Sequence, residues 1–204
     1  MRAYIIIFSA ISVDGRLAAK DGFSQLSCPY DKERQYRLRE EVDAVMVGAN
    51  TVRVDDPVLR RAKARVILSR SLNLNPDSRI FSVPPRTIVY TESEGETAST
   101  LRSKGVEVRR ASLDPCEIAK DLYSLGLRKV MLEGGGRTIW EFVRADCYDE
   151  VRVTISPRLF GSGVSLLQGE GFEGEKSPRL RLKSCDVCRC GNEVHLVYLK
   201  DKPN

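Results

Sequence analysis

The stretch from Lys129 to Arg144 decides the fold, and it reads Lys-Val-Met-Leu-Glu-Gly-Gly-Gly-Arg-Thr-Ile-Trp-Glu-Phe-Val-Arg. Its short apolar run, Val130–Leu132, is typical of a buried strand. The glycines Gly134–Gly136 follow, and apolar residues then recur at helical spacing over Thr138–Arg144. The segment therefore predicts a strand that passes through a glycine loop directly into a helix.

This glycine loop has the chemistry of a phosphate-binding turn. Glycines allow the backbone to approach an anion closely, and the N-terminus of a helix offers unpaired N–H groups and a favourable dipole. Glu133, at the end of the strand, is placed where open α/β sheets bind their ligands. The loop matches neither the dinucleotide-binding fingerprint nor the P-loop pattern, so a tight turn without a ligand is the alternative.

Length and composition indicate one globular domain. The 204 residues, 42% hydrophobic and 30% charged, are expected to fold as a single soluble domain over residues 1–204. The apolar run Ile5–Phe8 is too short for a signal-peptide core or a membrane span, so we expect a cytoplasmic protein that binds no membrane. The net charge of +5 is interspersed with acidic residues, which argues against nucleic-acid binding but suits a phosphorylated ligand.

The cysteines are concentrated near the C-terminus. Three of the six, Cys185, Cys188 and Cys190, lie close together, and the only histidine, His195, follows them. Structural zinc sites usually combine two separated ligand pairs, and this segment alternates like a strand. We therefore expect a structural role for these cysteines and no metal. The single histidine also argues against a histidine-based catalytic triad.

Apolar runs alternate with helical segments along most of the chain, which predicts a mainly parallel sheet with helices on both faces. Gly191-Asn192 indicates a hairpin near the C-terminus, and hence an antiparallel edge. Strands are expected at Tyr4–Phe8, Ala44–Val47, Arg65–Leu68, Thr87–Tyr90, Val106–Val108, Lys129–Leu132, Val151–Ile155, Leu180–Cys190 and Val194–Leu199. Helices are expected at Pro29–Glu41, Ala98–Lys104, Pro115–Leu125 and Thr138–Arg144, with Asp114 capping the third.

Three further loops follow predicted strands and are candidates for ligand contacts. Ser12–Ala18 contains an Asp-Gly turn signal. Val47–Pro57 begins with small residues and is expected to form a short helix capped by Asn50 or Thr51. Ile155–Gly161 closes another strand, and its arginine is interpreted as a surface cation.

Taken together, these segments resemble one family, the pyrimidine reductases of riboflavin biosynthesis. The family comprises stand-alone archaeal and fungal enzymes and the reductase half of the bacterial bifunctional deaminase–reductase. The motifs occur in family order and spacing over about residues 3–165. They are Ser-Val-Asp-Gly-Arg-Leu-Ala at 12–18, Ser27, Asp43–Gly48, Thr51-Val52, Asp55-Asp56-Pro57, Arg65–Leu68, Leu132–Gly136 and Ser156–Gly161.

The resemblance implies a fold, a cofactor and a substrate. The fold is a dihydrofolate-reductase-like, three-layer α/β/α arrangement in a homodimer. NADPH is the implied hydride donor, with NADH left open as a substitute. The implied reaction reduces the ribosyl group of 2,5-diamino-6-ribosylamino-4(3H)-pyrimidinone 5′-phosphate to a ribityl group.

Positions that match the family's motifs supply the candidate site. Those implied to bind the cofactor are Ala49, Thr51, Asp55, Arg70, Gly134, Gly135, Gly136 and Arg137. Those implied to contact the substrate are Arg16, Ser27, Arg60 and Glu133. Asp14 and Glu133 are the candidate catalytic residues, and no residue is assigned to a metal.

The sequence departs from the family pattern in three places. Many relatives have lysine where this chain has Arg16; arginine does not release a proton, so only phosphate or hydroxyl binding is expected there. After the third strand, Arg70 replaces part of an Asp-Ser pair and is either a partner of the NADPH 2′-phosphate or a loop cation. The zinc deaminase motif is absent, which predicts reduction without deamination. The resemblance to the stand-alone archaeal and fungal enzymes, which act before deamination, implies a substrate that is still aminated.

The expected chemistry is hydride transfer to C1′ of the ribose after the sugar ring opens to an imine, with the protein aligning donor and acceptor. Water, Asp14 or Glu133 can supply the proton, and the sequence does not choose among them. Two other functions stay open. One is a pterin or folate reductase of the same fold, which needs no contact to a 5′-phosphate, and the other is a non-catalytic nucleotide-binding module.

Overall fold

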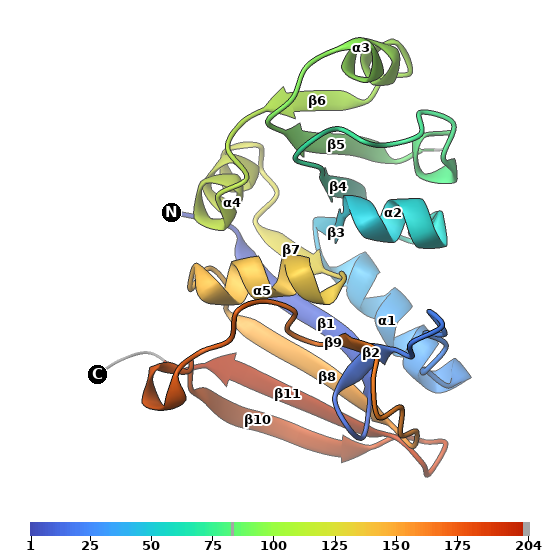
Figure 1. Ribbon diagram of the computed structural model, residues 1–204, viewed down its shortest axis with the longest axis vertical. Coiled ribbons are helices and arrows are strands. Elements are labelled where there is room, and N and C mark those ends of the chain that lie inside the picture. The colour runs from blue at the N-terminus through green and yellow to red at the C-terminus, as the bar shows by residue number, and fades with distance from the viewer. Residues whose placement is uncertain (83, 202–204) are drawn as a thin grey trace.

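A sheet of nine strands runs through the molecule in the order β10-β11-β8-β1-β7-β3-β4-β5-β6 (Figure 1). The computed structural model describes residues 1–82 and 84–201. The strands of this sheet are β1 (Tyr4–Ser12), β3 (Ala44–Gly48), β4 (Ala64–Leu68), β5 (Arg86–Thr91), β6 (Glu107–Arg110), β7 (Lys129–Leu132), β8 (Glu150–Ser156), β10 (Leu180–Val187) and β11 (Val194–Lys200).

Helices separate most of the parallel strands, as the alternating sequence pattern predicts. The α-helices are α1 (Pro29–Glu41), α2 (Ala49–Asp55), α3 (Glu96–Ser103), α4 (Pro115–Ser124) and α5 (Gly136–Arg144). Two short 3₁₀ helices, η1 (Arg79–Phe81) and η2 (Gly174–Lys176), lie in loops. No helix in the described part of the chain combines the length and the apolar character that crossing a bilayer requires.

The sheet separates two hydrophobic cores, which makes the fold three-layered. Helices α4 and α5 contribute Leu122 and Phe142 to the core on one face. Helices α1, α2 and α3 contribute to the core on the other face, through Leu38, Val52 and Leu101 respectively. Successive strand residues point to opposite faces, so strands such as β7 are buried on both sides. This arrangement confirms the predicted parallel sheet with helices on both faces.

The C-terminal edge of the sheet is antiparallel. Strand β11 pairs antiparallel with β8 and with β10, whereas β8 pairs parallel with β1. The predicted hairpin is therefore confirmed, although β10 ends at Val187 and the turn spans the residues up to Glu193. Figure 1 shows the hairpin at one end of the sheet, beyond β8.

Several element boundaries differ from the prediction. Strand β1 continues to Ser12 because it pairs with β8 along its second half, where Ser9 and Ser12 are buried despite their polarity. Helices α3 and α5 begin two residues earlier than expected. A separate two-stranded sheet, β2 (Arg16–Ala18) with β9 (Val164–Ser165), was not predicted because its strands are too short to show a pattern.

The helix caps were predicted with mixed success. Asp114 caps α4 as expected, because its carboxylate accepts hydrogen bonds of 2.9 Å from the N–H groups of Cys116 and Glu117. The predicted cap of α2 at Asn50 or Thr51 is wrong. That helix begins at Ala49, directly after β3, with Gly48 as its N-cap residue.

Candidate active site

A cavity of about 510 Å³ opens at the carboxyl ends of β1, β3 and β7. This is the edge at which open α/β sheets bind ligands. The cavity brings together five sequence-predicted site positions, on the loop after β7 and on α2, together with apolar side chains from the strands. Its lining includes Phe8, Leu17, Val47, Thr51, Asp55, Glu133, Gly134 and Gly135.

A second hollow of about 450 Å³ adjoins the cavity between the N-termini of α2 and α5. Asn50, Thr51, Gly135 and Val164 line both spaces, so the two are continuous. The hollow also contains Arg53, Gly136 and Arg137, among others. The site thus has a basic, glycine-lined end and a partly apolar end that contains Glu133.

The three glycines of the loop after β7 have different surroundings. A Cβ atom at Gly136 would collide with the carbonyl oxygen of Ser165, so only glycine fits there. A Cβ at Gly134 would make ordinary contact with Thr138, at 3.6 Å. A Cβ at Gly135 would have no heavy atom of the described residues within 4 Å beyond its chain neighbours. Gly135 therefore borders open space, and Gly136 holds the loop against β9.

The N-terminus of α5 is suited to an anion. Gly135 is its N-cap residue, and no side chain of residues 1–82 and 84–201 caps the helix. The first N–H groups of a helix lack internal partners and carry the positive end of its dipole. Arg137, in the first turn, is exposed and has no ion-pair partner within the described ranges. The hollow at this helix end therefore offers both backbone donors and a cation.

Glu133 is held by a buried ion pair. Its two carboxylate oxygens each accept a 2.6 Å hydrogen bond from the guanidinium of Arg39, and one also accepts a 2.8 Å bond from the amide of Gln35. The side chains of Arg39 and Glu133 are only 9% and 12% exposed. Both partners of Glu133 come from α1, so the ion pair fixes this helix to the end of β7.

The carboxylate of Asp14 is held in place by hydrogen bonds from two loops. Its carboxylate accepts hydrogen bonds from the hydroxyl of Ser12 at 2.6 Å and from the N–H groups of Phe160 and Gly161 at 3.0 and 2.7 Å. The bonds from Ser12 and Phe160 lower the pKa of Asp14 to about 2. The carboxylate therefore joins the loop after β1 to the loop after β8 and stays ionised at neutral pH.

The remaining sequence-predicted residues lie outside the walls of the two hollows. Ala49 opens α2 beside them, and Arg16 bonds to the hydroxyl of Ser165 in the small β2–β9 sheet. Ser27 is half-buried just before α1, and Arg60 is exposed in the loop after α2. Arg70 is exposed and pairs with Glu92 at 2.9 Å. The structure thus groups the glycine loop, Thr51, Asp55, Arg137 and Glu133, but not these five.

Sequence reasoning missed Arg39 and Gln35. Both lie in a helix in which charged and polar side chains occur all round, so neither stood out as buried. The available signal was their spacing: residues four apart lie on the same face of a helix. That spacing does not identify a partner that lies 94 residues further along the chain.

The fold and this site together define a class: an α/β protein in which the uncapped N-terminus of a helix lies beside a cavity at the carboxyl ends of parallel strands. Residues 3–196 match the family described as the RibD C-terminal domain. The chain belongs to this family.

Two relatives match the chain over almost its whole length. It is 32% identical to the 2,5-diamino-6-ribosylamino-4(3H)-pyrimidinone 5′-phosphate reductase of Methanothermobacter thermautotrophicus, over 97% of this chain and 98% of the relative. It is 34% identical to the reductase of the same name from Aquifex aeolicus, over 90% of this chain and 91% of the relative. The chain is accordingly an oxidoreductase, and the predicted family is confirmed.

Solved structures confirm the predicted fold. A bifunctional deaminase–reductase from Thermotoga maritima superposes with a TM-score of 0.86 at 26% identity; the match covers 98% of this chain and 57% of the bifunctional chain, so this protein spans somewhat more than half of it. Dihydrofolate reductase from Enterococcus faecalis, solved with NADP(H), superposes with a TM-score of 0.61 at 14% identity. The second likeness concerns the fold alone.

The Arg39–Glu133 pair generates the first prediction. Replacing Glu133 by glutamine leaves Arg39 buried without a counter-charge, which costs about 3–5 kcal/mol of unfolding free energy. The double variant Arg39→Met/Glu133→Gln should recover most of this loss, because it no longer contains the unpaired guanidinium of Arg39. Urea unfolding of the wild type, the two single variants and the double variant measures the coupling.

The exposed pair Arg70–Glu92 is the control, because its side chains are 71% and 36% exposed and such pairs contribute at most about 1 kcal/mol. A Glu133→Gln protein as stable as the Glu92→Gln protein would contradict the assignment of a buried, coupled pair.

Proposed function

We propose that this protein reduces the ribosyl group of 2,5-diamino-6-ribosylamino-4(3H)-pyrimidinone 5′-phosphate to a ribitylamino group, with NADPH as the reductant. The observation that carries the proposal is the continuity of the site. Gly135 borders both the anion-binding end of α5 and the cavity that contains Glu133. A ligand with a phosphate at α5 can therefore extend into the space beside Glu133. The relatives named for this reaction match the whole site region.

The residues at the basic end fit a dinucleotide phosphate. The backbone N–H groups of Gly136 and Arg137 would hold the phosphate, and Thr51 and Asp55 line the path from it to the cavity. NADPH, when bound, supplies a hydride. Arg70 would contact the 2′-phosphate only after exchanging its present partner, Glu92. The preference for NADPH over NADH would then depend on the opening of the Arg70–Glu92 ion pair.

The carboxylates of Asp14 and Glu133 act by orienting other groups, and neither supplies the proton. Asp14 is held ionised by its three donors, and both oxygens of Glu133 already accept bonds from Arg39 and Gln35. Glu133 would orient the polar groups of the substrate, and water would supply the proton. The sugar ring opens to an imine, C1′ gains the hydride, and the imine nitrogen gains one proton. The two additions together convert ribosylamine to ribitylamine.

The proposed function is tested by following NADPH oxidation in the presence of the synthetic substrate and identifying the product by mass spectrometry. We expect one ribityl product per NADPH consumed, and no oxidation with dihydrofolate. Glu133→Gln should lower turnover by about 100-fold through loss of orientation while NADPH affinity stays near wild type. Turnover of dihydrofolate alone would favour the pterin or folate reductase, and NADPH binding without turnover of either substrate would favour a binding module.

Gly135 offers a separate test of the cofactor site. Its φ and ψ of −66° and 156° are accessible to valine, and an added side chain meets open space rather than protein. Gly135→Val should therefore keep the unfolding temperature while weakening NADPH binding by at least about tenfold, since a desolvated charge-assisted contact is worth about 1.5–3 kcal/mol.

The matched control is Gly136→Val, which should lower the unfolding temperature because its side chain collides with Ser165. Fluorescence titration with NADPH and thermal unfolding measure the two effects. If Gly135→Val binds NADPH as the wild type does, the cofactor phosphate does not lie at this loop.

We also propose that the protein is a homodimer. Strand β10 forms one edge of the main sheet, and it exposes Leu180, Leu182 and Val187 by 39%, 51% and 72%. An exposed apolar edge of this kind favours pairing with another chain. Sedimentation velocity should show a dimer, and Leu182→Lys should shift it to a monomer, whereas Leu159→Lys at an exposed position elsewhere should not. A monomeric wild type at micromolar concentration would refute the proposal.

A further inference from the structure

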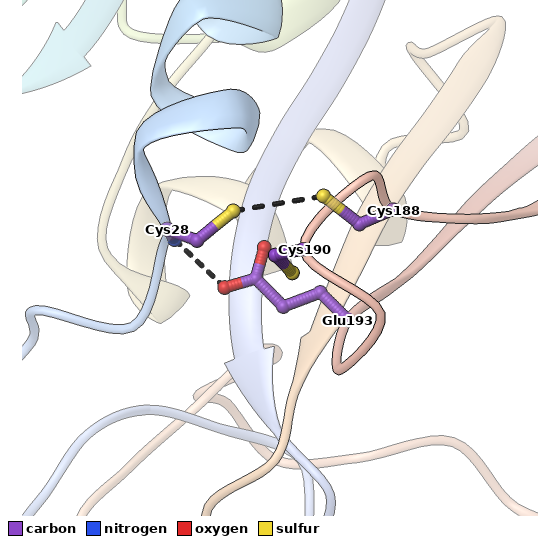
Figure 2. Close-up of side chains that lie close together, drawn as sticks. All are labelled: Cys28, Cys188, Cys190 and Glu193. Carbon is purple, nitrogen blue, oxygen red and sulfur yellow. Dashed lines mark hydrogen bonds between the residues drawn. The ribbon is translucent and has the colours of Figure 1, made fainter.

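Four potential metal ligands from two distant parts of the chain converge beside the N-terminus of α1. They are Cys28, Cys188, Cys190 and Glu193, called here the thiol cluster, and their ligand atoms all lie within 4.8 Å of one another. Figure 2 shows that Cys28 comes from the start of α1 and that the other three come from the turn between β10 and β11. The cluster lies outside the proposed active site.

The spacing of the cluster is close to that of a bound zinc ion. Zn–S bonds of about 2.3 Å and Zn–O bonds of about 2.0–2.2 Å place tetrahedral ligand atoms about 3.5–3.8 Å apart. The Sγ atoms of Cys28 and Cys188 are 3.6 Å apart. The widest separation in the cluster has to shorten by about 1 Å, a change within reach of side-chain rotation.

Glu193 supplies an independent indication of a cation. The residue is 3% exposed, and its Oε1 accepts a 2.7 Å hydrogen bond from the N–H of Cys28. Its Oε2 is buried and has no hydrogen-bond partner within residues 1–82 and 84–201. Figure 2 shows this second oxygen on the side of Cys190. A buried carboxylate oxygen without a partner is costly unless a cation or a donor reaches it.

The turn that carries three of the ligands is tightly built. The N–H of Cys188 donates to the carbonyl of Glu193, and the N–H of Gly191 donates to the carbonyl of Cys188, both at 2.8 Å. Gly191 has a φ of +77°, which glycine adopts without strain. The backbone therefore holds Cys188, Cys190 and Glu193 in a fixed arrangement before any metal binds.

We propose that the thiol cluster is a structural Zn²⁺ site. Thiolates are soft ligands that favour zinc over magnesium or calcium, and a carboxylate completes four-coordination. All four positions are then filled by protein, which is the arrangement of structural rather than catalytic zinc. Zinc binding connects Cys28, the residue directly before α1, to the β10–β11 turn.

The expectation that these cysteines bind no metal rested on the lack of a second group of ligands in the sequence. Folding supplies that group, because Cys28 lies 160 residues before Cys188 and meets it in space. Two residues that the sequence associated with the cluster take no part in it. Cys185 is exposed on β10, and His195 lies against Thr154 and Arg34.

A disulfide between Cys28 and Cys188 is the competing use of the same atoms. It would bring the two sulfurs to about 2.05 Å and remove two thiolate ligands from the site. The carboxylate of Glu193 would then remain without a cation. The unpartnered oxygen therefore favours the metal over the disulfide, and the experiment below separates the two.

The test begins with the intact protein, purified without oxygen and with a thiol reductant. We expect metal analysis to find one zinc per chain in the wild type and in Cys185→Ser, the matched control. Cys28→Ser and Cys188→Ser should bind zinc at least about tenfold more weakly. Losing a residue that only hydrogen-bonds to a metal ligand already lowers metal affinity by about 10–100-fold, and these variants lose a ligand itself. A competition titration with a chromophoric chelator measures each affinity.

Replacing zinc by Co²⁺ gives a readout that does not depend on activity, and in the wild type it does not depend on the stability of any variant. The wild type should show the visible bands of tetrahedral cobalt and an intense thiolate-to-cobalt charge-transfer band. That band should weaken in Cys190→Ser and persist in Glu193→Gln, because only the first loses a thiolate. The proposal is overturned by a reduced wild type that binds neither ion, by a zinc affinity of Cys28→Ser equal to that of the wild type, or by isolation of the native protein as a metal-free Cys28–Cys188 disulfide.

Discussion

The ion pair between Arg39 and Glu133 is the interaction on which the geometry of the site depends, because it connects two layers of the fold at the cavity itself. Arg39 belongs to α1, which covers one face of the sheet, and Glu133 directly follows β7 in the middle of the sheet. Buried ion pairs contribute little net stability but are costly to break. Such a pair therefore serves to fix an arrangement. Here it fixes the carboxylate that faces the ligand cavity.

Local patterns predicted much of this architecture. The apolar run before the glycines, the strand–helix alternation and the Asp114 cap depend on neighbouring residues, and each occurs in the structure as expected. The site was harder to predict, because its contacts join residues far apart in sequence. Arg39 reads as one more charge on a helix rich in charges, and nothing near it indicates that Glu133 will neutralise it. Asp14 was predicted as a site residue, yet the pattern could not show that backbone N–H groups after β8 would occupy its carboxylate.

The glycine loop illustrates the same limit on a smaller scale. The sequence motif does not distinguish Gly134, Gly135 and Gly136, and all three were predicted to bind the cofactor. In the structure, Gly136 is required by the close approach of Ser165, whereas Gly135 borders the open site. The difference arises from β9, a strand of two residues that is too short to leave a signal in the sequence. The motif thus predicts one ligand-binding loop, while the packing of a distant segment leaves Gly135 beside open space and gives Gly136 a structural role.

Helix α1 is positioned at both ends by contacts with distant parts of the chain. Its last turns are tied to β7 through Arg39, and its first residues are tied to the β10–β11 turn through Cys28 and Glu193. Zinc at the thiol cluster strengthens the second tie by adding four coordinate bonds and by giving the buried Oε2 of Glu193 a partner. Ser27, a sequence-predicted substrate contact, directly precedes Cys28, and the carbonyl of Leu26 accepts a bond from Ser156. The metal therefore fixes where the chain enters α1, and the ion pair fixes where that helix meets the cavity.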